Sequence, residues 1–200
     1  MTDADLGLSL PLPVPSAELE QRLAVRRSAP AQSLTAPGPS RAQVERILHL
    51  GARTPDHGKL FPWRFVVLGP TARADLAEAL LPLADRQPGA DKARKVLSKL
   101  TAAPVTILVV CSPVESQKVP VWEQHLSAGA VCMNIEHAAG ALGFSTSWIT
   151  DWYSYDREAL DLMDIREGEQ VAGFIHIGSL TEPPLERPRP DLAAITTWRD

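Results

Sequence analysis

The stretch GARTPDHGKLFPWRF, residues 51–65 of this 200-residue chain, is its most informative segment for both fold and function. It places two arginines, a histidine, a lysine, an aspartate and a tryptophan among two glycines and two prolines. The apolar run Val66–Leu68 follows at once. Prolines stiffen a loop, and rigid loops that carry polar groups are common positions for binding sites. The stretch therefore predicts a rigid loop presenting Arg53 and His57, directly ahead of a strand over Trp63–Leu68.

The polar side chains of this loop also have ordinary structural interpretations. Arg53 comes at the end of a predicted helix, where a cation interacts favourably with the helix dipole. A single loop histidine such as His57 is usually solvated or hydrogen-bonded, and Asp56 could orient its ring in either case. The loop alone leaves the choice between binding and structure open.

The composition is typical of a globular protein with one core. Hydrophobic residues make up 44% of the chain and charged residues 22%. The net charge is −4 and the 20 basic residues are spread out, so we expect no nucleic-acid partner. No apolar stretch is long enough to span a bilayer, and the start of the chain lacks a secretory signal. We therefore expect a cytoplasmic protein with no membrane partner.

Prolines mark an arm at each end of the chain. Three of them, Pro11, Pro13 and Pro15, lie in the first arm, and four more lie within residues 183–190. Such segments are extended and cannot take full part in a sheet. We expect an N-terminal Pro-rich arm over residues 1–15 and a single domain over residues 16–200, which includes a C-terminal extended arm.

Helix-like and strand-like patterns alternate between the arms. Ser40 and Gln43 form a capping-box pair ahead of apolar residues at helical spacing. The predicted helices are Ser16–Arg27, Ser40–Ala52, Thr71–Leu81, Asp91–Leu100, Val121–Leu142 and Asp156–Met163. The predicted strands are Trp63–Leu68, Val105–Cys111, Trp148–Thr150 and Gln170–Gly178. A few strands among many helices predict an α+β fold with helices on both faces of the sheet.

Two of these elements carry more detailed expectations. The run Val105–Cys111 lacks polar alternation, which predicts a central strand covered on both faces. The helix Val121–Leu142 is rich in alanine and glycine, so we expect it to be buried against another helix or in a subunit interface. Cys111 and Cys132 are expected to be reduced, buried thiols. The five histidines form no zinc-type motif, so no metal site is expected.

Two further segments are candidate sites with open alternatives. The segment VRRSAP contains Arg26, Arg27 and Ser28, whose forked donors and hydroxyl suit an anion such as phosphate. The same arginines could equally satisfy the carbonyls at a helix C-terminus. The segment STSWITDWYSYD, residues 145–156, carries aromatic side chains that suit either a core or a planar cofactor.

These segments occur in an order that resembles the nitroreductase family of FMN-dependent oxidoreductases. The motifs are RRS, then PDH followed by PW, then WEQHLSAGA, and the resemblance extends from about Leu19 to the C-terminus. It implies a nitroreductase-like α+β fold with a mixed or antiparallel sheet. It also implies an intertwined homodimer that binds FMN at the subunit interface.

The resemblance assigns residues to the cofactor sites by position. Arg26, Arg27 and Ser28 match the motif that contacts the flavin phosphate, ribityl chain and pyrimidine edge. Arg53 and His57 match groups that the partner subunit supplies. The other assigned flavin-binding residues are Trp148, Ile149, Thr150 and one of Arg187 and Arg189. The nicotinamide nucleotide is assigned to Ala138, Ala139, Gly140, Ala141, Leu142 and Gly143. No catalytic side chain is assigned, because the flavin itself carries the redox chemistry.

The implied reaction is a ping-pong cycle. NAD(P)H reduces FMN, and a nitroaromatic, quinone or similar small-molecule acceptor then reoxidises it. The alternatives keep the fold but change the chemistry to a dehydrogenase, dehalogenase or flavin-fragmenting enzyme, or to a flavin carrier or sensor without turnover. Ile149 and Asp151 stand where many relatives carry a basic residue and a glycine, which leaves the acceptor open.

Overall fold

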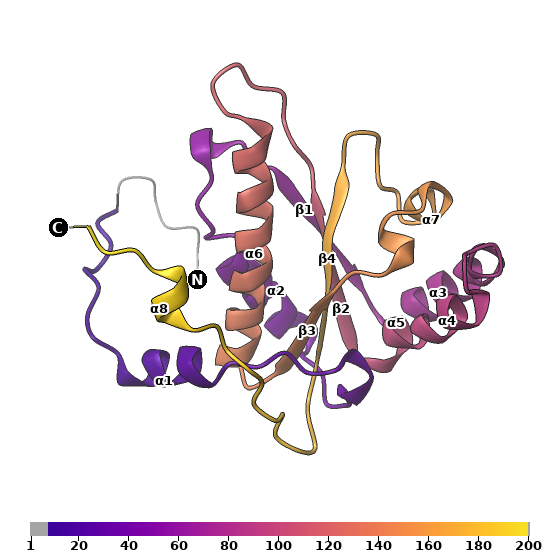
Figure 1. Ribbon diagram of the computed structural model, residues 1–200, viewed down its shortest axis with the longest axis horizontal. Helices are drawn as coiled ribbons and strands as arrows, with labels where there is room; N and C mark the ends of the chain where they lie inside the picture. The colour runs from indigo at the N-terminus through magenta and orange to yellow at the C-terminus, as the bar shows by residue number, and fades with distance from the viewer. Residues whose placement is uncertain (1–7, 200) are drawn as a thin grey trace.

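Four antiparallel strands form the sheet at the centre of the protein (Figure 1). The computed structural model describes residues 8–199. The strand order is β1-β2-β4-β3. The strands are β1 (Trp63–Leu68), β2 (Val105–Cys111), β3 (Ser145–Ile149) and β4 (Gln170–Gly178). Three strands have the predicted bounds, whereas β3 begins at Ser145 rather than at Trp148.

The central strand β2 is covered on both faces, as its unbroken apolar sequence predicts. Ile107 and Val109 pack into one hydrophobic cluster, and Leu108 and Val110 pack into another. All four are at most 1% exposed. Alternate residues of a strand point to opposite faces, so β2 joins two separate cores.

Helices cover both faces of the sheet (Figure 1), which confirms the α+β prediction. The helices are α1 (Ala17–Val25), α2 (Arg41–Gly51), α3 (Pro70–Ala84), α4 (Ala90–Val96), α5 (Ser98–Ala102), α6 (Val121–Ala141), α7 (Arg157–Asp161) and α8 (Leu192–Ile195). Three short 3-10 turns are η1 (Ala31–Ser33), η2 (His57–Lys59) and η3 (Trp152–Ser154). Helices α2 and α6 pack on one face, and α3, α5 and α7 belong to the other side.

Two predicted helices differ from the observed ones. Helix α3 continues through Pro82 to Ala84, because the buried Leu83 and Ala84 gain core contacts that offset the missing proline N–H. The predicted helix Asp91–Leu100 is broken into α4 and α5 at Leu97, whose N–H bonds to a carbonyl only three residues earlier. The C-terminal segment, predicted as wholly extended, contains the short helix α8.

Helix α6 is buried along one side, where Val131, Cys132 and Ile135 contact the sheet core. The close approach of α2 depends on Gly51 of that helix, since a Cβ there would lie 2.7 Å from Ile135 Cγ1. Helix α6 therefore packs against another helix, as its sequence predicts, and Gly51 of α2 contributes to their close approach. Both cysteines are free and buried, and burial raises the pKa of Cys111 to about 11 and of Cys132 to about 12.

The N-terminal arm, α1 and α8 lie outside the sheet, on the side where α6 covers it (Figure 1). Residues 8–15 of the predicted N-terminal arm have no regular structure, and residues 1–7 lie outside the described part of the chain. Helix α1 buries none of its side chains, so Leu19 and Leu23 are more than half exposed. Within residues 8–199, no helix combines the length and apolar character needed to cross a membrane.

Candidate functional site

The loop ahead of β1 is held by its own aspartate. The Asp56 carboxylate accepts hydrogen bonds from the backbone N–H groups of Leu60 and Phe61. It does not orient His57, as the sequence suggested it could. The His57 ring is instead paired through Nδ1 with the Glu123 carboxylate of α6 at 2.7 Å.

Helix α6 fixes this loop at further points. The Ser127 hydroxyl donates to the Pro55 carbonyl oxygen at 3.0 Å and accepts from the Trp63 indole N–H at 3.2 Å. The Asn134 amide donates to the Thr54 hydroxyl at 2.7 Å. The PDH and WEQHLSAGA motifs therefore form one surface, which borders an open cleft of about 440 Å³.

Replacing Ser127 by alanine tests this connection. We expect Ser127→Ala to lower the free energy of unfolding by about 1–2 kcal/mol, because the indole N–H and the carbonyl each lose a partner. Urea unfolding measures the change, with Ser145→Ala of β3 as a control of the same chemistry. Equal small losses in both variants would show that the Ser127 bonds do not fix the loop.

The RRS segment leaves α1 in an extended conformation and crosses to α6 and β3. Arg26 Nη1 lies 3.9 Å from the Glu136 carboxylate and donates to the Ser28 hydroxyl at 3.5 Å. The Glu136 side chain is only 3% exposed and also accepts from the Thr146 hydroxyl at 2.9 Å. The Arg26 guanidinium therefore contacts a buried carboxylate, which the helix-dipole interpretation does not explain.

The C-terminal arm brings a third arginine to the same place. Arg189 Nη2 donates to the Arg26 carbonyl oxygen at 3.3 Å, and Arg27 Nε donates to the Leu185 carbonyl oxygen at 2.9 Å. Glu186 lies between them, 2.9 Å from Arg189 and 3.9 Å from Arg27. Arg27 and Ser28 line a cleft of about 460 Å³ together with residues 180–186. Of the two candidate C-terminal arginines, Arg189 is the one whose side chain joins this cluster.

The two sets of predicted flavin-binding residues lie at opposite ends of α6. The loop carrying His57 is bound near the start of the helix at Glu123, and Arg26 is bound near its end at Glu136. Thirteen residues of helix separate these glutamates by about 20 Å. The His57 loop and the Arg26 segment of one chain are therefore not brought together.

Trp148 and Ile149 end β3 at the edge of the sheet, and Thr150, predicted as the last strand residue, follows the strand. The Trp148 indole N–H donates to the Ala172 carbonyl oxygen at 3.0 Å. A Cβ on Gly173 would lie 2.1 Å from the same indole nitrogen, so only glycine leaves room for this ring. Ile149 is half-buried, and the Thr150 hydroxyl is hydrogen-bonded to the Tyr155 hydroxyl at 3.0 Å.

The unusual Asp151 has a structural role. Its carboxylate lies 2.8 Å from Lys99 Nζ and accepts a hydrogen bond from the N–H of Trp152, which starts η3. Lys99 thereby compensates the negative charge that Asp151 adds next to β3.

The segment expected to meet a nicotinamide nucleotide forms the end of α6 and the turn after it. Ala138 and Ala139 are buried, whereas Ala141 and Gly143 are exposed. The Gly140 carbonyl oxygen accepts a hydrogen bond from Arg22 of α1 at 2.9 Å. Leu142 is half-buried. A nucleotide reaching this segment would contact the turn rather than the two buried alanines.

Sequence reasoning missed the acidic partners of the site. Glu123 belongs to the WEQ motif, which follows PDH in the order of motifs. The sequence therefore offered a signal that Glu123 could lie near His57. Glu136 carries no local signal, because it meets Arg26 only through the fold. Glu186 is three residues from Arg189, but its contact with Arg27 also depends on the fold. Among residues 8–199, no group of three or more His, Cys, Asp or Glu side chains gathers in a geometry suited to a metal ion.

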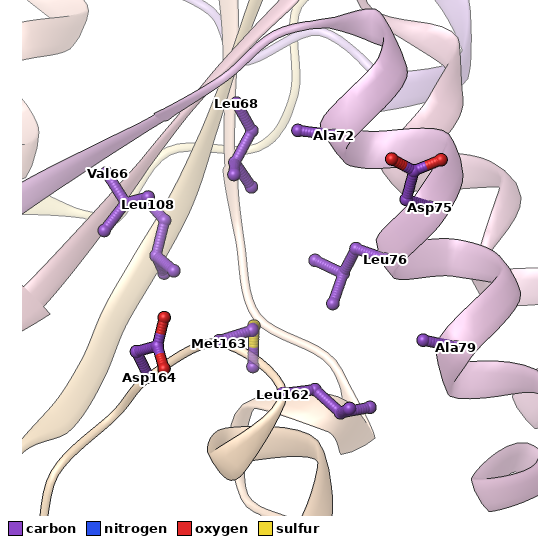
Figure 2. Close-up of a pocket in the computed structure, with 10 residues that line it drawn as sticks. All are labelled: Val66, Leu68, Ala72, Asp75, Leu76, Ala79, Leu108, Leu162, Met163 and Asp164. Atoms are coloured by element: carbon purple, nitrogen blue, oxygen red, sulfur yellow. The ribbon is translucent and has the colours of Figure 1, made fainter.

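A separate apolar pocket lies on the other face of the sheet (Figure 2). It has a volume of about 400 Å³ between β1, β2, α3 and the segment after α7. Leu76, Leu108 and Met163 form its inner wall, and Asp75 and Asp164 lie on either side of it. None of the predicted flavin-binding residues lines this pocket.

Comparisons with known proteins agree with the motif order. The family model described as "Nitroreductase family" matches residues 13–179. The chain is 34% identical to the Escherichia coli K12 protein named "Putative NAD(P)H nitroreductase YdjA", over 77% of this chain and 84% of that protein. The chain belongs to the nitroreductase family.

Solved structures show the same fold. A nitroreductase-like family protein from Bacillus cereus aligns with a TM-score of 0.79 at 18% identity, covering 94% of this chain and 100% of that one. A nitroreductase with bound FMN from Bacteroides fragilis aligns with a TM-score of 0.72 at 19% identity, covering 92% and 100%. The predicted nitroreductase-like α+β fold is therefore confirmed.

Proposed function

We propose that this protein is an FMN-dependent oxidoreductase that uses NAD(P)H as reductant. The observation that carries the proposal is the cluster of Arg26, Arg27, Ser28 and Arg189, of which Arg27 and Ser28 line one cleft. Three guanidinium groups and a hydroxyl form a donor set that suits a phosphate monoester. The names of the relatives, which include NAD(P)H and bound FMN, support the same conclusion.

The proposal gives a role to each group of residues around the flavin. FMN, when bound, supplies the hydride-accepting chemistry. Arg26, Arg27, Ser28 and Arg189 hold its phosphate end, and the end of β3 at Trp148 borders the flavin. Arg53 and His57 approach from a second subunit. Cations near the flavin also stabilise the negative charge of its reduced form.

The second subunit is part of the proposal because the site is split along α6. Large hydrophobic side chains are exposed on both arms, α1 and the outer side of α6, and such patches mark interfaces. They include Leu12, Val14, Leu19, Leu23, Val25, Trp122, Leu126, Leu185, Leu192, Ile195 and Trp198. We propose a homodimer in which the arms of each chain cover α6 of the other. Sedimentation equilibrium that gives a monomer mass at micromolar concentration would contradict it.

The visible absorption spectrum is the direct test of the proposed activity. We expect the purified protein to show a flavin band that bleaches when NADPH or NADH is added without oxygen. Bleaching and recovery with a nitroaromatic or quinone acceptor would support the reductase. A flavin band that resists both nucleotides would instead favour a flavin carrier or sensor. Parallel double-reciprocal plots for nucleotide and acceptor are expected for a ping-pong cycle, and intersecting lines would exclude it.

Cofactor binding should also stabilise the folded protein. A ligand that binds only the native state at 100 times its Kd adds about 2.7 kcal/mol to the free energy of unfolding. We therefore expect the melting temperature to rise as FMN is added, with riboflavin, which lacks the phosphate, as the matched control. An unchanged melting temperature at saturating FMN would contradict specific binding.

Three sequence expectations stay predictions beside this proposal. They are the cytoplasmic location, the division into an arm over residues 1–15 and a domain over residues 16–200, and the nicotinamide contact at residues 138–143. The dehydrogenase, dehalogenase and flavin-fragmenting alternatives would use the same donor set for the flavin phosphate, so FMN binding does not separate them from the reductase. Reoxidation of the reduced flavin by nitroaromatic or quinone acceptors does.

A further inference from the structure

The cation cluster of the proposed FMN site contains a carboxylate from the chain itself. Glu186 lies 2.9 Å from Arg189 and 3.9 Å from Arg27. Its charged form is favoured by the Arg187 backbone N–H, which donates to it, and by the two nearby arginines, and together these lower the pKa of Glu186. Two of the arginines expected to hold a phosphate are therefore already paired with an anion.

This carboxylate differs from the other one at the cluster. Glu136 is 3% exposed and is hydrogen-bonded to Thr146, so its removal from Arg26 would leave a buried charge. Glu186 is 62% exposed and lies on the C-terminal segment after β4, outside the sheet. Exposed ion pairs contribute little to stability, because solvent screens them. Glu186 is thus the carboxylate at the cluster that a stronger anion can replace.

A phosphate monoester is such an anion. It carries a charge near −2 at neutral pH and three acceptor oxygens, and it forms bidentate contacts with arginine. We propose that Glu186 is the internal counter-ion of Arg27 and Arg189, which the phosphate of the flavin displaces on binding. This inference rests on the proposed function and makes Glu186 a residue that sets affinity for the phosphorylated cofactor.

The expected signature is selective for phosphate. In Glu186→Gln, the side chain keeps its size but loses the charge that competes for the arginines. We expect the Kd for FMN, measured by flavin fluorescence quenching at low ionic strength, to fall by about two- to fivefold. The Kd for riboflavin should not change. Glu182→Gln is the matched control, because Glu182 lines the same cleft without a contact to Arg27 or Arg189.

Two results would overturn the proposal. The first is an unchanged or higher Kd for FMN in Glu186→Gln, and the second is an equal change for riboflavin. A gain in FMN affinity that shrinks at high salt supports the proposal, because salt screens the competing charge.

A separate probe distinguishes this inference from the proposed function. If the wild-type protein binds neither flavin, the melting temperature in inorganic phosphate still reports on the anion site. A larger phosphate-induced rise in Glu186→Gln than in wild type would support the counter-ion and count only against the FMN function. Equal rises, or none, in the two proteins would overturn the counter-ion itself.

Discussion

Replacing Arg26 by glutamine is expected to weaken FMN binding and to destabilise the fold at once. One charge-assisted contact to the phosphate is worth about 1.5–3 kcal/mol, so the Kd for FMN should rise roughly 10- to 150-fold. The free energy of unfolding should fall by about 1–3 kcal/mol, because the buried Glu136 loses its cation and keeps only the Thr146 hydroxyl. Fluorescence titration and urea unfolding measure the two effects.

The double variant Arg26→Gln with Glu136→Gln separates binding from structure. Neutralising Glu136 removes the unpaired buried charge, and the new amide can still accept from Thr146. We expect most of the stability to return while FMN binding stays weak. Recovery of both properties would show that Arg26 acts only by holding the RRS segment on α6, and would remove it from the phosphate site.

The sequence predicted well those parts of the fold that local pattern determines. The strands β2 and β4 are mostly buried apolar runs, and β1 is a half-buried run of mainly apolar residues, so their composition indicates their bounds. The start of β3 was missed because Ser145, Thr146 and Ser147 are polar. Thr146 is buried in a strand only because its hydroxyl finds the Glu136 carboxylate, ten residues earlier in the sequence but on another element. The sequence alone does not indicate that Glu136 is the partner of Thr146.

The candidate site shows the same contrast between features set by local sequence and features that depend on long-range contacts. Motif order predicted Arg26, Arg27, Ser28 and His57 as site residues, because residue identity is local information. The pairings of His57 with Glu123 and of Arg27 with Glu186 are long-range. The motif order offered a signal for the first pairing, whereas nothing in the sequence indicated the second. The choice of Arg189 over Arg187 was equally beyond the sequence, because it depends on which side chain the arm turns toward the RRS segment.

Glu169 is expected to be the main source of acid sensitivity outside the proposed site. Arg64 of β1 binds its carboxylate through two nitrogens, at 2.8 and 2.7 Å. The Ser112 hydroxyl and the Arg166 N–H also donate to it. The Arg64 contact first, and then these donors, lower the pKa of Glu169 from 4.5 to about 2. A carboxylate this well satisfied joins β1, the end of β2 and the turn before β4.

Replacing Glu169 by glutamine should lower the free energy of unfolding at pH 7 by about 1.5–3 kcal/mol, because the hydrogen bonds between a charged carboxylate and Arg64 are lost. The pKa is lower in the folded state, so this stabilisation is complete above the unfolded pKa of 4.5. It is lost as the pH falls through about 2. Urea unfolding of both proteins from pH 7 to pH 2 should therefore give two curves that converge in acid.

Two features make this comparison decisive. Burial lowers the pKa of His176 to about 4 and adds its own acid sensitivity, but it does so equally in both proteins and cancels in the difference. The exposed pair Arg86–Glu158 has the same 2.7 Å separation as Arg64–Glu169. Because solvent screens that pair, Glu158→Gln should change stability by less than about 1 kcal/mol. Two results would show that the Arg64–Glu169 pair contributes no more than a surface contact. The first is an equal loss of unfolding free energy in Glu169→Gln and Glu158→Gln. The second is a difference between wild type and Glu169→Gln that stays constant down to pH 2.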